Sequence, residues 1–379
     1  MHILSIVGAR PQFVKVAMIA AELRKFEAVG AVHHTLVHTG QHYDRSMSDT
    51  FFNELSIPAP QHNLEVGSGI HGKQTAAMLE RIEQVLQDER PNVVMVYGDT
   101  NSTIAGALAA AKLHIPVAHV EAGLRSFNRQ MPEEVNRVIA DHLSTILLCP
   151  TRSAVQNLNN EGISAGVHLV GDVMLDAVLS WRQVARTKSC VLQRLHLRAA
   201  EYVLLTIHRA ENTQSPDQTA EFFDSLLNIP YPVVFPVHPR TRDWLDREPA
   251  LRALRDRLAC SERIRLIEPV SYLEMLALED NARVIVTDSG GVQKEAYFLG
   301  VPCLTIRSET EWLETLDGGW NRLIGSRAEN MGPMLASLWN NNGATPTGAP
   351  DLRLFGNGEA AKKIIGVVAG ELTGLEVMA

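Results

Sequence analysis

Short apolar runs alternate with longer stretches of helical spacing along most of the 379-residue chain. Several runs, among them residues 93–97 and 284–287, are apolar almost throughout, as is typical of strands covered on both faces. Alternation on this scale favours an α/β fold with parallel sheets. The runs predicted as strands are residues 3–7, 35–39, 93–97, 117–120, 146–149, 202–206, 233–237, 265–267, 284–287 and 303–306.

The alternation pauses in a polar stretch between about residues 180 and 201 and restarts with Tyr202. At roughly 150 residues per domain, a chain of this length predicts about two domains. We therefore expect two doubly wound domains, residues 1–172 and residues 173–358, with the boundary within residues 171–200. The predicted helices include residues 13–26, 73–89, 102–113, 133–143, 242–257, 292–299 and 359–371.

Composition argues against several classes of protein. The net charge is −8, and no Lys/Arg run is longer than two residues, which disfavours a nucleic-acid partner. The sequence shows neither a basic leader nor the ~18 apolar residues of a membrane span, so we expect a cytoplasmic protein without a membrane partner. Scattered cysteines predict reduced, mostly buried thiols rather than disulfides; they are Cys149, Cys190, Cys260 and Cys303.

Two patterns that could indicate a cofactor or a metal ion are weak. The G-x-G-x-x-G match at residues 67–72 follows no clean apolar strand, so a dinucleotide cofactor is not expected. His34, His38 and His42 are spaced four apart, but residues 35–39 are predicted as a strand, which breaks the helical face that this spacing requires. We therefore expect no cofactor and no metal ion.

Residues 8–15 place two cations where a predicted strand turns into a helix. Proline at position 11 suits the first turn of a helix. The free backbone amides of a helix start attract anions, and Arg10 and Lys15 would add positive charge. A plain strand-to-helix turn with surface cations explains the same residues equally well, so both interpretations stay open.

Residues 288–295 repeat this arrangement in the second half of the chain. Ser289 can cap a helix, and Gly290 and Gly291 let the backbone approach a ligand. Glu295 lies one turn into the helix, where its carboxylate could accept hydrogen bonds from ribose hydroxyls. The glycine pair favours a phosphate-binding helix start over a simple capping turn.

Carboxylates follow neighbouring strands of the first half. Asp99 and Glu121 come within two residues of the ends of predicted strands, so each places a carboxylate over the same sheet edge. Glu133 and Glu134 stand at a helix start, where an acid often only complements the helix dipole; this accounts for one of the two. Carboxylates grouped in a crevice can exchange protons with a substrate near neutral pH.

Cationic groups follow two strands of the second half. His208 and Arg209 come after one predicted strand, and His238 comes after the next. Such groups suit a pyrophosphate, and a histidine can protonate or polarise a leaving phosphate. A single histidine is more often structural, but two at equivalent strand ends favour a binding role. Because the carboxyl ends of parallel strands line one crevice, these groups together predict an enzyme site for a phosphorylated substrate.

A series of motifs spans nearly the whole chain: Gly8-Ala9-Arg10-Pro11, Thr39-Gly40-Gln41-His42, Tyr97-Gly98-Asp99-Thr100, His119-Val120-Glu121-Ala122-Gly123-Leu124-Arg125, Pro132-Glu133-Glu134-Val135-Asn136-Arg137, Val170-Gly171-Asp172, His208-Arg209-Ala210-Glu211-Asn212, Pro236-Val237-His238-Pro239 and Thr287-Asp288-Ser289-Gly290-Gly291. In this order the motifs are highly specific together. The chain resembles the non-hydrolysing UDP-N-acetylglucosamine 2-epimerases.

The resemblance implies two Rossmann-like domains in the GT-B arrangement, with the site in the interdomain cleft. It further implies a homodimer and a C-terminal helix, about residues 359–379, that packs back on the first domain. The implied reaction interconverts UDP-GlcNAc and UDP-ManNAc by anti elimination of UDP and re-addition through 2-acetamidoglucal. The partner is therefore a UDP-sugar, and no cofactor is needed.

The resemblance also implies roles for individual residues. It makes Asp99, Glu121 and Glu133 the acid/base carboxylates, with His208 also needed for turnover. Residues that bind or flank UDP are then Arg10, His208, His238, Ser289, Gly290, Gly291 and Glu295. The charge patterns described above add Lys15 and Arg209 to this binding set.

The sequence departs from the family pattern at two places. Many bacterial members have an allosteric UDP-GlcNAc site whose residues are replaced here by residues 41–45 and by Lys73-Gln74, which puts activation by substrate in doubt. The pattern Thr-Glu-Arg-Pro-Glu near the sugar pocket reads Thr310-Glu311-Trp312-Leu313-Glu314, which leaves the sugar open. A UDP-2,3-diacetamido uronic acid is thus an alternative substrate.

Three other functions compete with the epimerase: a GT-B glycosyltransferase, a hydrolysing epimerase and a catalytically silent UDP-sugar-binding protein. Glycosyl transfer alone needs no base at C2, so the three carboxylates favour the epimerase. Their retention together with His208 disfavours a silent binding protein. The hydrolysing epimerase is the weakest of the three.

Overall fold

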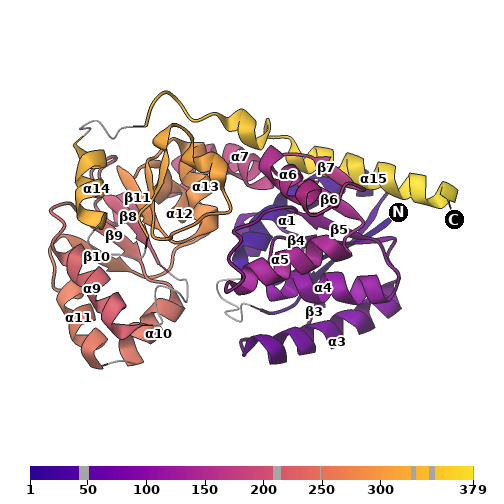
Figure 1. Ribbon diagram of the computed structural model, residues 1–379, viewed down its shortest axis with the longest axis horizontal. Helices are drawn as coiled ribbons and strands as arrows, with labels where there is room; N and C mark the ends of the chain where they lie inside the picture. The colour runs from indigo at the N-terminus through magenta and orange to yellow at the C-terminus, as the bar shows by residue number, and fades with distance from the viewer. Residues whose placement is uncertain (42–50, 208–214, 248, 326–329, 341–345, 379) are drawn as a thin grey trace. The chain divides into compact units, whose positions relative to one another are not determined.

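The computed structural model describes residues 1–41, 51–207, 215–247, 249–325, 330–340 and 346–378. The chain divides into two compact units, Met1–Ala177 with Leu352–Ala379, and Val178–Asp351. Each unit contains one parallel sheet (Figure 1), which confirms the predicted α/β class. None of the helices in the described residues is long and apolar enough to cross a membrane.

The first unit holds a seven-stranded sheet in the order β3-β2-β1-β4-β5-β6-β7. The winding reverses between β1 and β4, which pair in parallel. In sheets of this type, ligands bind outside the carboxyl ends of the strands at such a switch point. The strands are β1 (His2–Val7), β2 (His33–His38), β3 (His62–Asn63), β4 (Val93–Tyr97), β5 (Val117–Val120), β6 (Ile146–Cys149) and β7 (Val167–Leu169).

In the same unit, α3, α4 and α5 pack in a row, and α1 packs against the C-terminal helix α15 (Figure 1). The buried Asp176 carboxylate caps α15, because it accepts hydrogen bonds from the amides of Ala360 at 3.1 Å and Ala361 at 2.8 Å. This cap holds the last helix to the unit that contains the start of the chain. The helices are α1 (Arg10–Glu27), α3 (His71–Glu89), α4 (Asn101–Lys112), α5 (Pro132–Leu143), α6 (Arg152–Asn160), α7 (Val173–Lys188, which continues into the second unit) and α15 (Ala360–Met378).

The second unit repeats this winding in a six-stranded sheet, in the order β10-β9-β8-β11-β12-β13. Its switch point lies between β8 and β11. The two sheets therefore place their candidate ligand sites at equivalent strand ends, after β1 and β4 in one and after β8 and β11 in the other. The strands are β8 (Val203–Thr206), β9 (Val233–Pro236), β10 (Ile264–Ile267), β11 (Val284–Thr287), β12 (Cys303–Thr305) and β13 (Asn321–Leu323).

The helices of the second unit correct one prediction. The segment 242–257, predicted as one helix, contains parts of two, and Pro249 opens the second of them. Proline has no amide to donate, so it suits a helix start and interrupts a helix interior. The helices are α8 (Val191–Arg194), α9 (Pro216–Leu227), α10 (Pro239–Arg247), α11 (Pro249–Ala259), α12 (Tyr272–Asp280), α13 (Gly290–Leu299) and α14 (Met331–Trp339).

All four cysteines are free, as predicted, but only Cys149 and Cys303 are buried. Burial raises the pKa of each of these two thiols to about 12, so both stay protonated at neutral pH. Cys190 and Cys260 are exposed, which contradicts the prediction of mostly buried thiols. Each of the two exposed cysteines lies next to a helix end rather than in a strand.

Candidate active site

Lys15 and Glu121 form a buried ion pair in the first unit. Lys15 lies in the second turn of α1, and Glu121 directly follows β5. The Lys15 Nζ is 2.6 Å from Glu121 Oε1, and the side chains are only 7% and 10% exposed. With Pro150, Gly171 and Asp172, the pair lines a small hollow. The pair therefore fixes a carboxylate at the edge where ligands are expected.

The backbone beside this pair is conformationally restricted. Gly98 has a φ of 61°, and a Cβ there would lie 3.2 Å from Lys15 Nζ and 3.3 Å from Glu121 Oε1. Glu121 itself has a φ of 74°, which is disfavoured for a residue with a Cβ. Such strain gathers at functional sites, where surrounding contacts maintain it. The turns after β4 and β5 thus meet at the ion pair.

Lys15→Met should lower turnover by about 100-fold, which is the lower end of the rate loss expected when a group that supports acid–base catalysis is removed. The substitution leaves the Glu121 carboxylate buried without its cation, which is costly and alters its position. Steady-state turnover kinetics would measure the loss. Lys112→Met, on the exposed end of α4, is the matched control. Unchanged kinetics in Lys15→Met would contradict a catalytic role for the pair.

Arg137 holds the second candidate carboxylate. Its guanidinium forms an ion pair with Asp99 Oδ2, and the side chains of Arg137 and Asp99 are 2% and 26% exposed, respectively. Asn136 Nδ2 donates to the backbone oxygen of Asp99 at 3.0 Å. Helix α5 therefore anchors the turn after β4, while the Asp99 carboxylate stays partly accessible.

The structure separates the roles of Glu133 and Glu134. Glu134 is buried and accepts hydrogen bonds from both the amide and the hydroxyl of Ser126, each at 2.9 Å, and from the Phe127 amide at 3.0 Å. It also pairs with Arg137 at 3.2 Å. Glu133, half-buried one position earlier, makes no side-chain hydrogen bond or ion pair within the described part of the chain. Glu134 is thus structural, and Glu133 remains the candidate for chemistry.

A buried network that the sequence analysis missed supports these turns. The two ring nitrogens of His119 face acceptors: Nε2 is 2.7 Å from the Gly98 oxygen, and Nδ1 is 2.7 Å from Asp141 Oδ1. Asp141 Oδ2 accepts from Arg125 Nη1 at 2.6 Å and from the Gly123 amide at 3.1 Å. The sequence feature that could have predicted this network is His119 itself, a histidine inside the otherwise apolar strand β5. A buried polar group needs a hydrogen-bond partner.

The charge state of Asp141 follows from this network. Burial alone raises the pKa of its carboxyl, but the hydrogen bond and charge of His119, followed by Arg125, outweigh it, and the net pKa lies below the usual value. Asp141 is therefore ionised at neutral pH. A fully buried anion between His119 and Arg125 ties β5 to the loop that follows it.

The other candidates of the first unit lie at the start of α1. Arg10 is its first residue, and the guanidinium carbon lies 5.9 Å from the centre of the Phe51 ring. The amides of Gly8 and Ala9 donate to Gln12 Oε1 at 2.7 and 3.0 Å. These two amides are therefore satisfied within the chain, and the amides of Gln12 and Phe13 donate to the Ala9 oxygen at 2.9 and 3.3 Å. This helix start therefore attracts an anion through the positive charge of its side chains.

In the second unit, the start of α13 has the predicted form. Ser289 Oγ accepts a hydrogen bond from the Val292 amide at 3.5 Å, which makes it the N-cap. A Cβ at Gly290 would lie 2.6 Å from Glu311 Oε1, whereas at Gly291 the nearest atom would be 3.8 Å away. A Cβ at Gly290 would therefore displace the Glu311 carboxylate, whereas a Cβ at Gly291 would make only ordinary van der Waals contact.

Glu295 has a buried partner that the sequence analysis also missed. Glu279, at the end of α12, is fully buried, and its pKa is raised well above the usual value by burial and then by the Glu295 charge and hydrogen bond. The raised pKa favours the neutral form of Glu279, so the two neighbouring buried acids do not both carry a charge. An acid at the C-terminal end of a helix interacts unfavourably with the helix dipole. The position of Glu279 at the end of α12 was therefore the sequence feature that could have marked it as unusual.

The remaining candidates follow β8 and β9. His238 is partly exposed between the end of β9 and the start of α10. His208 and Arg209 lie outside the described residues. Among the described candidates, the structure brings Lys15 and Glu121 into contact, and it groups Ser289, Gly290 and Gly291 at one helix start.

Comparison with known proteins identifies the family. The family profile described as UDP-N-acetylglucosamine 2-epimerase matches residues 24–369, most of both units. The chain belongs to this family. It is therefore a UDP-sugar 2-epimerase, an isomerase, as the motifs predicted.

Individual relatives are similar in sequence to this UDP-sugar 2-epimerase over nearly its full length. The chain is 48% identical to the UDP-N-acetylglucosamine 2-epimerase homolog of Methanococcus maripaludis, covering 97% of this chain and 99% of that protein. It is 44% identical to the UDP-2,3-diacetamido-2,3-dideoxy-D-glucuronate 2-epimerase of Pseudomonas aeruginosa, with coverages of 96% and 98%. These two relatives have different named substrates, so family membership alone leaves the sugar open.

Solved structures of related proteins have the same fold as this epimerase. The Methanocaldococcus jannaschii UDP-GlcNAc 2-epimerase, crystallised with UDP-GlcNAc and UDP, matches with a TM-score of 0.88 and 41% identity. The match covers 97% of this chain and 99% of that one. The predicted class, two Rossmann-like domains of GT-B type, is thereby confirmed.

Proposed function

We propose that this epimerase interconverts UDP-GlcNAc and UDP-ManNAc without hydrolysis. The observation that carries the proposal is the pair of fixed carboxylates after β4 and β5, Asp99 held by Arg137 and Glu121 held by Lys15. A reaction at C2 of the sugar needs such groups, because a proton must leave one face of that carbon and return to the other.

The proposed chemistry needs no redox cofactor. The C2 proton is only weakly acidic, so its removal is coupled to loss of UDP from C1, which yields 2-acetamidoglucal and UDP. Cations stabilise the departing diphosphate. UDP then adds back at C1, which restores the bond between the sugar and UDP. Protonation of C2 from the opposite face inverts the configuration at C2.

Each candidate residue takes one role in this scheme. Asp99, Glu121 and Glu133 share the C2 proton chemistry, and His208 assists turnover beside the leaving diphosphate. The cations assigned to the pyrophosphate are Arg10, Arg209 and His238. The helix start at Ser289, Gly290 and Gly291 binds phosphate, and Glu295 binds the ribose. The proposal includes action as a cytoplasmic homodimer, as the family resemblance implies.

A second substrate is supported by two observations. The Pseudomonas aeruginosa relative is named for a UDP-2,3-diacetamido sugar acid. In this chain, residues 310–314 also depart from the family pattern beside α13, where Thr310 Oγ1 donates to Gln293 Oε1 at 2.7 Å. An epimerase of such a sugar acid is therefore the alternative.

Proton NMR of the purified protein with UDP-GlcNAc in D₂O tests the proposal. UDP-ManNAc with deuterium at C2 is the expected product, because the C2 proton exchanges with solvent in the elimination step. Free ManNAc with UDP would instead identify a hydrolysing enzyme. Turnover of the UDP-2,3-diacetamido sugar acid, with UDP-GlcNAc unchanged, would replace the first substrate with the second.

A further inference from the structure

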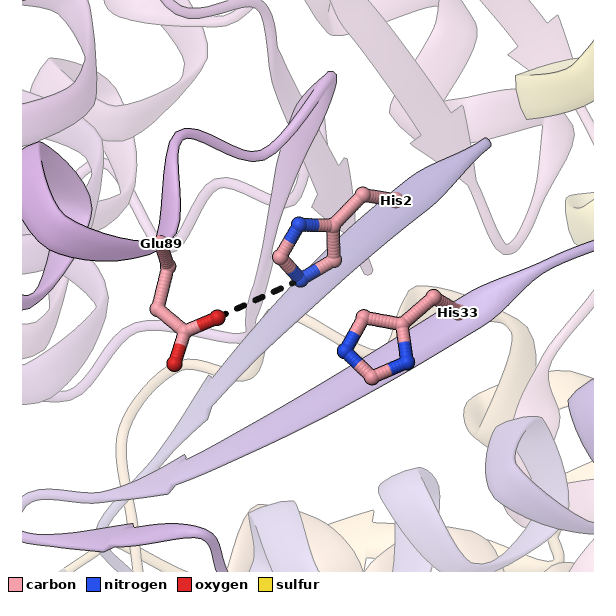
Figure 2. Close-up of side chains that lie close together, drawn as sticks. All are labelled: His2, His33 and Glu89. Atoms are coloured by element: carbon pink, nitrogen blue, oxygen red, sulfur yellow. Dashed lines mark ion pairs between the residues drawn. The ribbon is translucent and has the colours of Figure 1, made fainter.

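His2, His33 and Glu89 come together at the amino edge of the first sheet (Figure 2). His2 begins β1 and His33 begins β2, and the two residues are direct partners in the parallel register. Glu89 is the last residue of α3. The carboxylates assigned to catalysis follow the carboxyl ends of the strands, so this cluster lies at the opposite edge of the same sheet.

The geometry of the cluster suits one metal ion. A ligand atom from each residue lies within 4.8 Å of the other two. His2 Nε2 is 3.8 Å from Glu89 Oε2, and the two imidazole centres are 4.6 Å apart. Tetrahedral zinc, with bonds of about 2.1 Å, needs its ligand atoms ~3.4 Å apart. Small side-chain rotations therefore bring all three ligands to a metal.

Neighbouring side chains already orient the three groups. His62 Nε2 binds Glu89 Oε1 at 2.7 Å, so the other carboxylate oxygen faces His2. The Thr35 hydroxyl lies 2.9 Å from His2 Nε2 and 3.5 Å from His33 Nε2, so both rings direct the same nitrogen toward one point, where a bound ion would replace the hydroxyl as their partner. His62 is an outer partner of the kind typical of metal sites, because it contacts the Glu89 oxygen that does not face His2.

We propose that His2, His33 and Glu89 bind one divalent transition-metal ion of the zinc type. Three protein ligands leave the fourth tetrahedral position to water. The bound ion would join the starts of β1 and β2 to the end of α3, so its role is to stabilise the first unit rather than to act on the sugar. His33 is exposed, which gives the ion a route from solvent.

The proposal revises the sequence-based expectation of no metal ion. That expectation weighed only the four-residue spacing after His34, whereas His2 and His33 meet through strand pairing and are far apart in the sequence.

Titration of tag-free, EDTA-treated protein with Co²⁺ and then Zn²⁺ tests the proposal. We expect one equivalent of Co²⁺ per chain with the absorption of a tetrahedral ion, displacement by Zn²⁺, and a zinc-dependent rise of a few degrees in the unfolding temperature. His33→Ala and Glu89→Gln should each weaken zinc binding by at least tenfold. His142→Ala, an exposed histidine on α5, is the matched control and should bind as the wild type does.

Two outcomes would overturn the site: no saturable binding of one equivalent, or equal affinity in His33→Ala, Glu89→Gln and the control. The second outcome would place the metal on other histidines of the chain. Circular dichroism of the two variants shows whether they fold, and the exposed position of His33 makes its replacement mild. Epimerase activity is a separate readout, because the proposed ion lies at the far edge of the sheet from the catalytic carboxylates.

Discussion

Asp99→Asn should lower the rate of epimerisation by about 1,000-fold, within the range for loss of a general acid or base. The amide keeps the shape of the carboxylate but cannot take a proton from C2. The fold should survive, because Arg137 retains its pair with the buried Glu134 at 3.2 Å. Asp99 is itself 26% exposed, so the substitution leaves no deeply buried group unpaired.

Kinetics and exchange together decide what Asp99 does. We would measure turnover and the incorporation of deuterium at C2, alongside UDP binding. Loss of both turnover and exchange with UDP binding retained is the expected pattern. Asp88→Asn, an exposed acid at the end of α3, is the matched control. Wild-type turnover in Asp99→Asn would refute the acid–base assignment, and a raised KM with normal kcat would make Asp99 a binding residue only.

Most strands that are largely apolar were predictable from the sequence, and three short strands were not. The predicted bounds of β4, β5, β6 and β11 agree with the structure, because each is a largely apolar run that is fully buried. Strands β3, β7 and β13 were missed. They have two or three residues each, with polar side chains among them, so no periodic pattern can develop.

The positions of the candidate carboxylates were predictable from the sequence only at the strand ends. Asp99 and Glu121 could be located because each comes within two residues of the end of an apolar run. Their partners could not, since Arg137 and Lys15 reach them from helices through packing that no local pattern encodes. Glu279 is a further example: it meets Glu295 only because α12 and α13 pack together.

Asp141→Asn should destabilise the first unit by roughly 3–5 kcal/mol, the usual cost of breaking a buried ion pair. The carboxylate is fully buried and accepts from His119, Arg125 and the Gly123 amide. An asparagine cannot neutralise Arg125, whose remaining carboxylate partner, Glu161, is 28% exposed. Asp88→Asn should again leave stability unchanged, since surface substitutions seldom exceed about 0.5 kcal/mol.

The sequence provides an internal reference for this measurement. All five tryptophans lie between positions 181 and 339, within the second unit. Urea unfolding followed by tryptophan fluorescence therefore reports on that unit, whereas circular dichroism reports on both. We expect Asp141→Asn to move the circular-dichroism transition to lower urea. An unchanged transition would show that the network contributes little to the stability of the first unit.

The pH dependence gives an independent check on the same prediction. The pKa of folded Asp141 lies below its ordinary value of 3.8, so its stabilising contribution is fully present above that pH. It is lost as the pH falls through the lower, folded value, because protonation then favours the unfolded chain. The stability difference between wild type and Asp141→Asn should therefore be largest near pH 7 and shrink below about pH 3.8. A difference that stayed constant from pH 7 to pH 3 would mean that the lost packing or hydrogen bonds, rather than the charge, account for the destabilisation.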